Sequence, residues 1–184
     1  LIAGVALLTA YTLHARRISN PAIDLSLMEY KPFRASIAGG FLLRTSLAAQ
    51  PFILPLLLQL GLGMSAAKSG LITLATAAGS MTTRIFLPYL AQALGFKRVL
   101  ILMTVFISLL YVVYTQFGPG TPVAVLFGVL AFNGFGRAAL MVNLSTMGYS
   151  SIPTPRMGRA TALAAMAQQL SISFGVTVGA ALLN

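Results

Sequence analysis

The chain has 184 residues, of which 58% are hydrophobic and 8% are charged, and its formal net charge is +10 at pH 7. A soluble domain carries about a quarter of its residues as charged side chains, so this composition excludes an ordinary soluble fold and predicts a membrane protein. With no cysteine, one histidine and two acids, the chain holds no thiolate metal site, catalytic triad or carboxylate pair, and we expect no enzyme, metal or cofactor.

The positive charge also bears on nucleic acid as a partner. Nucleic-acid-binding proteins gather basic residues on soluble faces, together with aromatic platforms. Here the basic residues separate long apolar runs instead, which is typical of membrane topology. We therefore expect a lipid bilayer, and no nucleic acid, as a partner.

The first 34 residues precede the first complete span. Residues 1–13 are apolar but too short to cross a bilayer, which takes about 20 residues, so they suit the end of a truncated helix. The chain starts inside this apolar run without a methionine, so we expect a piece of a longer membrane protein. Residues 14–34 form a linker. Its apolar side chains favour a short interfacial helix, with Asp24, Glu29 and Lys31 facing water, and a plain cytoplasmic linker is the alternative.

Complete spans are expected over residues 35–60, 66–90, 99–117, 122–149 and 160–183. The first carries Arg44 about ten residues in, near mid-bilayer at about 1.5 Å per residue. Pro51 and Pro55 follow on nearly the same face, and such prolines are tolerated where neighbours or water satisfy the freed carbonyls. Ser65 is a suitable N-cap for the second span.

The second span carries Arg84 near its end, and the turn after it holds Gly95, Lys97 and Arg98. At that depth the Arg84 side chain can extend to the interface, so a structural role is the favoured interpretation. The third span is aliphatic, and the turn GPGTP (Gly118–Pro122) closes it.

The fourth span has polar side chains on one face. Spacings of three and four place the following residues on the same side of a helix, opposite an entirely apolar face: Asn133, Gly136, Arg137, Leu140 and Asn143. A polar face in a membrane must look at protein or water rather than at lipid. Because a buried arginine is costly, the default interpretation of Arg137 is a functional site in a polar cavity. Asn133 and Asn143 could either orient a substrate or bridge helices.

The fifth span has a face of small and polar residues, formed by Ala164, Gln168, Ser171, Gly175 and Gly179. Gly175 and Gly179 make a GxxxG pair, which favours close helix packing. Gln168 as a hydrogen-bond donor that faces a cavity is the sharper alternative.

The basic residues also predict the topology. The loops on one side hold Arg16, Arg17, Lys31, Arg34, Lys97, Arg98, Arg156 and Arg159, whereas the loops on the other side hold only Lys68. Because positive residues are enriched in cytoplasmic loops, we predict that the first group is cytoplasmic. The expected fold is therefore an all-α, polytopic transmembrane helix bundle.

Three stretches resemble a known transporter family: NPAIDLSLM at residues 20–28, LQLGLGMSAAKSGL at 58–71 and SIPTPRMGRATAL at 151–163. In order and spacing they are similar to the C-terminal part of the EmrB/QacA-type drug:proton antiporters of the major facilitator superfamily. The resemblance implies a multi-pass protein of the plasma (bacterial inner) membrane that exports small molecules, as in multidrug efflux, by alternating access coupled to protons. It also implies that residues 35–184 form a C-terminal bundle, incomplete at its C-terminus, whose partner is an N-terminal half.

The chain departs from that family in several places. The family's loop motif GxxxDRxGRR retains only Gly95, Lys97 and Arg98 here, with Gln92 in place of its acid, which weakens any latch that uses that acid. The family's arginine before a Gln-Leu pair is Gln168. Its proton-carrying acids are expected in the N-terminal half, and no expected span here contains Asp or Glu. Structural or gating roles are expected for Arg84, Gly95, Lys97, Arg98, Gly175 and Gly179.

The superfamily builds each half from inverted three-helix repeats whose first helices line the central cavity. Arg44 and Arg137 lie on these helices here, and we predict that both point into the cavity. Either they pair with acids or helix-end carbonyls of the missing half, or they bind an anionic substrate group such as a carboxylate. The candidate substrate-binding residues are thus Arg44, Arg137, Asn133, Asn143 and Gln168. Alternatives to multidrug export are an exporter of organic anions and a truncated, non-transporting membrane module.

Overall fold

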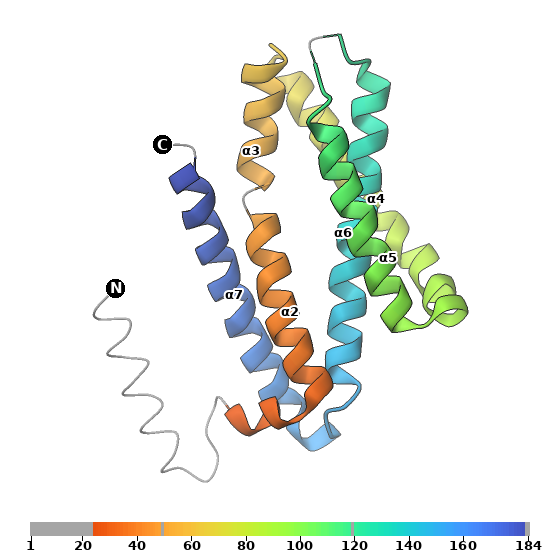
Figure 1. The fold of residues 1–184 in the computed structure, drawn as a ribbon, viewed down its shortest axis with the longest axis vertical. Coiled ribbons are helices and arrows are strands. Elements are labelled where there is room, and N and C mark those ends of the chain that lie inside the picture. Colours follow the sequence, from red (N-terminus) through yellow and green to blue (C-terminus); the bar gives the residue numbers. More distant parts are fainter. Residues whose placement is uncertain (1–23, 49, 119, 183–184) are drawn as a thin grey trace.

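The computed structural model describes residues 24–48, 50–118 and 120–182, and the long elements within these ranges are helices (Figure 1). In chain order they are η1 (Leu25–Glu29), α2 (Lys31–Ala48), α3 (Gln50–Leu56), η2 (Leu57–Gly61), α4 (Ala66–Leu94), α5 (Phe96–Tyr114), α6 (Val123–Tyr149), η3 (Thr154–Arg156) and α7 (Met157–Leu182). By length and composition, five of the described segments can cross a membrane: Lys31–Gly61, Ala66–Leu94, Phe96–Tyr114, Val123–Tyr149 and Thr154–Ala181. The predicted all-α transmembrane fold is confirmed. The helix predicted for residues 1–13 and the linker residues 14–23 lie outside the described residues.

The first span is the segment Lys31–Gly61, and its described parts are α2, α3 and the π-helical turn η2. It begins at Lys31, earlier than the predicted residue 35, because Pro32 lies in the first turn, where its missing N–H is not needed. Pro51 and Pro55 lie in α3 and remove two donors that a continuous helix would use. Among the described residues of this span, the regular α-helix gives way to the π-helical turn η2 just after these prolines.

The second span runs longer than predicted, to Leu94, and ends where Gly95 adopts a positive φ of 77°. That conformation favours glycine, because a Cβ would clash there. α5 begins at the very next residue. At the other end of α4 the predicted cap is confirmed, since Ser65 Oγ accepts a hydrogen bond from the Lys68 N–H at 3.4 Å.

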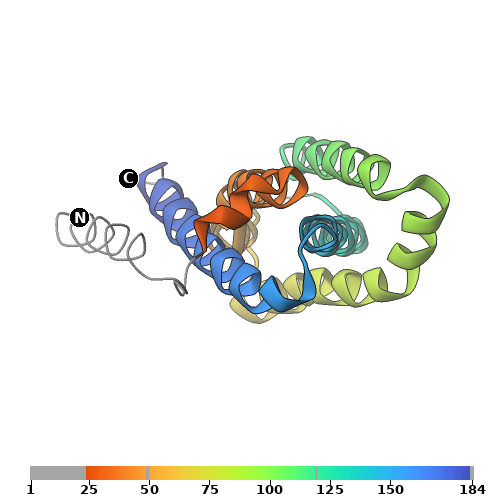
Figure 2. The same cartoon turned by 90° about the horizontal axis from the view of Figure 1, so that it is seen from below.

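α6 lies at the centre of the described bundle, with α2, α4 and α5 around it (Figure 2). α4 and α6 approach each other closely at two glycines. A Cβ on Gly79 of α4 would collide with the Ala131 carbonyl of α6, and a Cβ on Gly134 of α6 would collide with the Thr76 carbonyl of α4. Only glycine allows two helix backbones to come this close.

α7 corresponds to the fifth predicted span, and it packs on α2 through the face of small residues described for that span. A Cβ on Gly175 would collide with the Thr45 carbonyl of α2, and Gly179 is buried in the same helix. Thr45 Oγ1 also donates a hydrogen bond to the Ser171 carbonyl at 3.3 Å. The two helices are thus held by close packing together with a polar contact.

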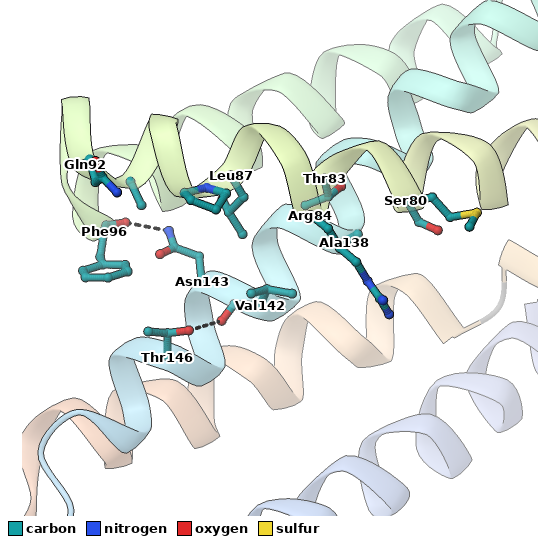
Figure 3. Close-up of a pocket in the computed structure, with 13 residues that line it drawn as sticks. Ser80, Thr83, Arg84, Leu87, Gln92, Phe96, Ala138, Val142, Asn143 and Thr146 are labelled. Carbon is teal, nitrogen blue, oxygen red and sulfur yellow. Dashed lines mark hydrogen bonds between the residues drawn. The ribbon is translucent and has the colours of Figure 1, made fainter.

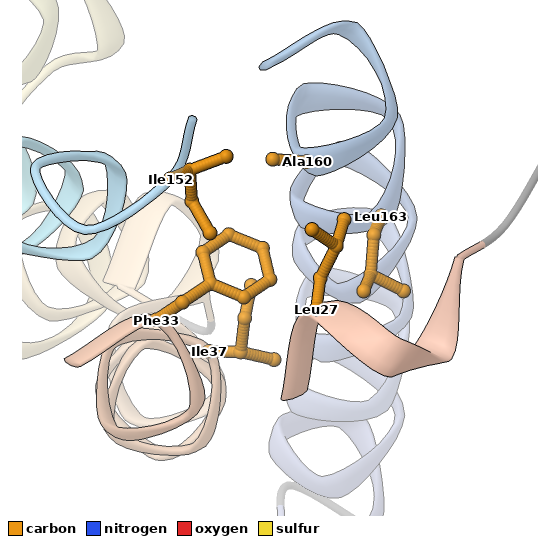
Figure 4. Packing of buried hydrophobic residues seen from close by; sticks show 6 residues of the cluster. All are labelled: Leu27, Phe33, Ile37, Ile152, Ala160 and Leu163. Atoms are coloured by element: carbon orange, nitrogen blue, oxygen red, sulfur yellow. The ribbon is translucent and has the colours of Figure 1, made fainter. Parts of the chain in front are cut away.

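The short helix η1 docks against α7 at one end of the bundle. A buried cluster forms there from Leu27, Phe33, Ile37, Ile152, Ala160 and Leu163 (Figure 4). Leu27 of η1 is fully buried, so its side chain faces protein rather than lipid. The linker is therefore packed onto the bundle along η1.

Asp24 does not face water, in contrast to the prediction for the linker. Its side chain is mostly buried, and Oδ1 accepts hydrogen bonds from the Ser26 N–H at 3.1 Å and from Ser26 Oγ at 2.6 Å. Arg159 Nη1 lies 3.5 Å from Asp24 Oδ2. The hydrogen bond from the Ser26 side chain is the main reason that the pKa of Asp24 lies below its usual range, and burial opposes this effect.

We expect Asp24→Asn to remove a pH-dependent part of the stability. Because the pKa of Asp24 is lower in the folded protein than in the unfolded chain, the carboxylate stabilises the fold above the unfolded pKa, and this contribution is lost as the pH falls through the folded pKa. The free energy of unfolding of the variant should be lower by about 1 kcal/mol at neutral pH. It should also lack the loss of stability that the wild type shows as the pH falls. Thermal unfolding of the full-length protein in lipid nanodiscs, followed by circular dichroism across pH, measures both effects.

Glu29→Gln is the matched control for Asp24→Asn, because Glu29 lies at an exposed position of the same helix. This control variant should still lose stability at acid pH as the wild type does. Identical pH profiles for the wild type and Asp24→Asn would contradict the role given to the Asp24 carboxylate.

We expect Gly134→Ala to destabilise the protein by about 1–3 kcal/mol, because the added methyl group would meet the backbone of α4 and force the helices apart. Gly128→Ala is the control on the same helix, since a Cβ there meets nothing within 4 Å. The midpoint of thermal unfolding in nanodiscs reports the difference. Equal midpoints for the two variants would show that α4 and α6 do not approach as described.

Candidate functional site

Two asparagines of α6 are almost fully buried. Asn133 is 1% exposed and Asn143 is 2% exposed. Asn143 Nδ2 donates a hydrogen bond to the Phe96 carbonyl at 2.8 Å, which joins α6 to the first turn of α5. Because an amide is costly to bury unless it is hydrogen-bonded, Asn143 marks a fixed contact between helices. Asn143 thus bridges two helices through Nδ2, while its Oδ1 has no partner among the described residues, so a role in orienting a substrate stays a prediction.

A polar cluster surrounds Gln50 at the start of α3, and we call its members, Gln50, Tyr111, Asn133 and Arg137, the Gln50 cluster. Gln50 Nε2 donates to Asn133 Oδ1 at 2.9 Å. Gln50 Oε1 accepts hydrogen bonds from Tyr111 Oη at 3.3 Å and from Arg137 Nη1 at 3.4 Å. The cluster therefore joins α3, α5 and α6 through one side chain.

Sequence reasoning missed Gln50 and Tyr111. The signal for Gln50 was its place as a polar residue directly before Pro51 inside an apolar run. Tyr111 carries a hydroxyl in the third span, as Thr104, Ser108 and Tyr114 also do, and a tyrosine hydroxyl away from water needs a partner. Neither position follows a periodic pattern, so helical spacing alone did not select them.

Arg44 and Gln168, both predicted to be cavity-facing, come together at one hollow. The hollow has a volume of about 400 Å³ and lies between α2, α6 and α7, with Val142, Thr146 and Tyr149 also in its wall. The Arg44 side chain folds back along its own helix, because Nη1 lies 2.7 Å from the place that a Cβ on Gly40 would occupy. Gly40 thus leaves room for the guanidinium one turn before Arg44.

Arg84 lines a larger cavity, of about 810 Å³, between α4 and α6 (Figure 3). Leu87 and Pro88 contribute to its wall from α4, and Val142, Asn143 and Thr146 contribute from α6. Figure 3 shows the Arg84 side chain extending away from α4, with its guanidinium far from Asn143. Arg84 is exposed, which agrees with a side chain that can reach water.

The structure separates the candidate residues into two groups. Arg137 and Asn133 lie in the Gln50 cluster, whereas Arg44 and Gln168 line the hollow beside α7. Arg137 is not among the residues that line either the Arg44 hollow or the Arg84 cavity. Arg44 and Arg137 therefore line no common hollow among the described residues, and the prediction that both point into the central cavity stays a prediction.

The loop residues with expected gating roles lie at the joint of α4 and α5. Gly95 provides the positive φ there, and Lys97 and Arg98 are exposed in the first turn of α5. Val99 after them is fully buried. The α4–α5 joint points toward the end of the bundle that holds η1 and η3 (Figure 1), and the prediction that this side is cytoplasmic stays a prediction.

Comparison with known proteins identifies relatives. The family model described as Major Facilitator Superfamily matches residues 1–184. Similar curated proteins are provisionally named multidrug resistance protein MdtD. The protein of this name from Pectobacterium atrosepticum is 30% identical over 181 residues, which cover 98% of this chain and 39% of that protein. The one from Escherichia coli strain K12 is 30% identical over 98% of this chain and 38% of its own length.

The chain thus spans about two fifths of the length of these curated relatives. No solved structure matches it. The resemblance drawn from the three motifs is confirmed by the family match and by these relatives.

We expect Gln50→Leu to lower the stability by about 1–3 kcal/mol, because it leaves the buried Asn133 amide and the Arg137 guanidinium without the partners described here. Gln59→Leu is the control, since Gln59 is exposed in the same span. Thermal unfolding in nanodiscs measures the difference. If Gln50→Leu is as stable as Gln59→Leu, the cluster does not hold the helices together.

Proposed function

The chain belongs to the major facilitator superfamily, and from this premise we propose that residues 35–184 form the C-terminal bundle of a secondary active transporter that exports small molecules. The observation that carries the proposal is the family match along the whole chain. The relatives' name, multidrug resistance protein, supports export of the multidrug type. The membrane would be the bacterial inner membrane, as the bacterial relatives suggest.

The mechanism we propose is alternating access, in which this bundle rocks against an N-terminal half around a site near mid-membrane. The bundle supports this in two ways. The close contacts at Gly79, Gly134 and Gly175 make it suited to move as one body. The Arg44 hollow and the Arg84 cavity provide polar side chains within largely apolar walls, where a solute could bind.

We propose that protons drive the export. Both acidic residues of the chain, Asp24 and Glu29, precede Lys31, where the first span begins. A carboxylate that carries the proton would therefore come from the N-terminal half. This bundle would contribute cations and hydrogen-bonding groups to the pathway.

An exporter of organic anions is the second candidate. The observation that favours it is the set of arginines within the spans, Arg44, Arg84 and Arg137, in spans that hold no acid. Intramembrane charges face a cavity or a partner charge, and guanidinium groups suit carboxylates by their planar geometry. A lipophilic cation would meet like charge on this bundle.

We expect the full-length protein that carries this sequence to move solutes in proteoliposomes when a pH gradient is imposed. Uptake of a lipophilic cation dye and of an organic anion should be compared, with and without a protonophore. Proton coupling predicts that the protonophore reduces uptake to the rate of protein-free liposomes. If neither solute moves although the protein is folded, the transporter proposal is wrong; if uptake continues with the protonophore, the coupling is wrong.

A further inference from the structure

We propose that Arg44 and Arg84 bind the two acidic ends of one elongated organic dianion, whose apolar middle lies across Val142 of α6. The inference rests on the proposed transport function, because it names a substrate class for the cavity of that transporter. It replaces Arg137 by Arg84 as the partner of Arg44.

The first support is that the two arginines line adjoining spaces. Val142 and Thr146 of α6 belong to the wall of the Arg44 hollow and also to the wall of the Arg84 cavity. Arg44 approaches this shared wall from α2, and Arg84 approaches it from α4. One ligand that lies over the shared wall therefore reaches both guanidinium groups.

The second support is that both charges lack a partner among residues 24–48, 50–118 and 120–182. Neither Arg44 nor Arg84 makes a hydrogen bond or ion pair there, whereas Arg137 donates to Gln50 Oε1. The ion pair found in these ranges joins Arg159 to Asp24. A cation at membrane depth needs an anion or water, and a dianion supplies one carboxylate for each arginine.

The third support is the depth of the two side chains. Arg44 lies thirteen residues after Lys31, about 20 Å from the cytoplasmic start of α2, and Arg84 lies ten residues before Leu94, about 15 Å from the cytoplasmic end of α4. The Arg44 guanidinium folds back over Gly40, toward that same end. Both charges thus lie in the same layer of the bundle.

The shared wall is apolar toward the ligand, which argues for an apolar middle. Thr146 Oγ1 donates to the Val142 carbonyl at 2.9 Å, so its hydroxyl is satisfied within α6 (Figure 3). In the Arg44 hollow alone, Ser145 Oγ likewise donates to the Met141 carbonyl at 2.9 Å. The wall therefore offers methyl groups rather than free donors. Cavities of about 400 and 810 Å³ fall in the range of small-molecule sites.

The test is binding of defined anions to the full-length protein in nanodiscs, measured by isothermal titration calorimetry. The probe is azelate, a dicarboxylate with a long methylene chain. Malonate is the short dicarboxylate, and nonanoate is the monoanion of matching length. The proposal predicts that azelate binds at least about tenfold more tightly than either, because only azelate reaches both arginines. Equal affinity for malonate or nonanoate would overturn it, and this comparison needs no variant.

Variants then locate the site. Arg44→Gln and Arg84→Gln should each weaken azelate binding at least about tenfold, whereas Lys68→Gln, at an exposed position of the first turn of α4, should not change it. Arg84→Lys should retain part of the affinity, because the charge stays, and thermal unfolding checks that each variant is folded. Arg84→Gln with unchanged affinity would overturn the proposal. So would a loss of binding in Arg137→Gln but not in Arg84→Gln.

Transport measurements separate this inference from the proposed function. If the protein exports the cation dye under a pH gradient but does not bind azelate, the dianion site is wrong and the transporter stands. If azelate binds in an arginine-dependent manner but no tested solute crosses the bilayer, the site stands and the transport function is wrong.

Discussion

The close approach of α4 and α6 at Gly79 and Gly134 sets the position of the polar groups in the centre of the bundle. Lipid is as apolar as leucine, so helices in a membrane associate through close packing and hydrogen bonds rather than through the hydrophobic effect. Once these two backbones are in contact, the rotation of α6 is fixed, and with it the directions of Asn133, Arg137 and Val142. The Arg84 cavity lies along the same helix pair, so its shape depends on this contact.

Hydrogen bonds then tie α6 to each helix around it. Ser36 of α2 donates to the Leu144 carbonyl at 2.8 Å, and Thr83 of α4 donates to the Phe135 carbonyl at 3.0 Å. The Gln50 cluster adds α3, and the amide of Asn143 adds α5. Each bond gives a partner to a group that lipid could not satisfy, although Asn133 Nδ2 and Asn143 Oδ1 stay without a partner among the described residues. The central helix is therefore the common partner of its neighbours.

The fold could be predicted from sequence because a bilayer imposes long apolar runs, and five of these appear among the described residues. The neighbours of Arg137 could not be predicted in the same way. Helical spacing shows which residues share a face, but it does not show which helix lies against that face, and Gln50 is 87 residues away from Arg137. Asp24 is a similar case, since its local pattern suits water, while Arg159 approaches it from 135 residues later in the chain. The role of Arg84 was predicted from its depth alone, and its place in the wall of the same cavity as Val142 could be found only from the tertiary structure.

The docking of η1 on α7 has a mechanical consequence for the helix that carries Arg44. Residues 1–23 join the bundle at Asp24, and η1 is attached to α7 through Leu27 and through the Asp24–Arg159 pair. A force applied at Asp24 is therefore shared by α2 and α7, because Leu27 packs in one cluster with Phe33 and Ile37 of α2 and with Leu163 of α7. η1 thus ties the first turns of α2 and α7 together, so that the helix with Arg44 and the helix with Gln168 are coupled at this end of the bundle.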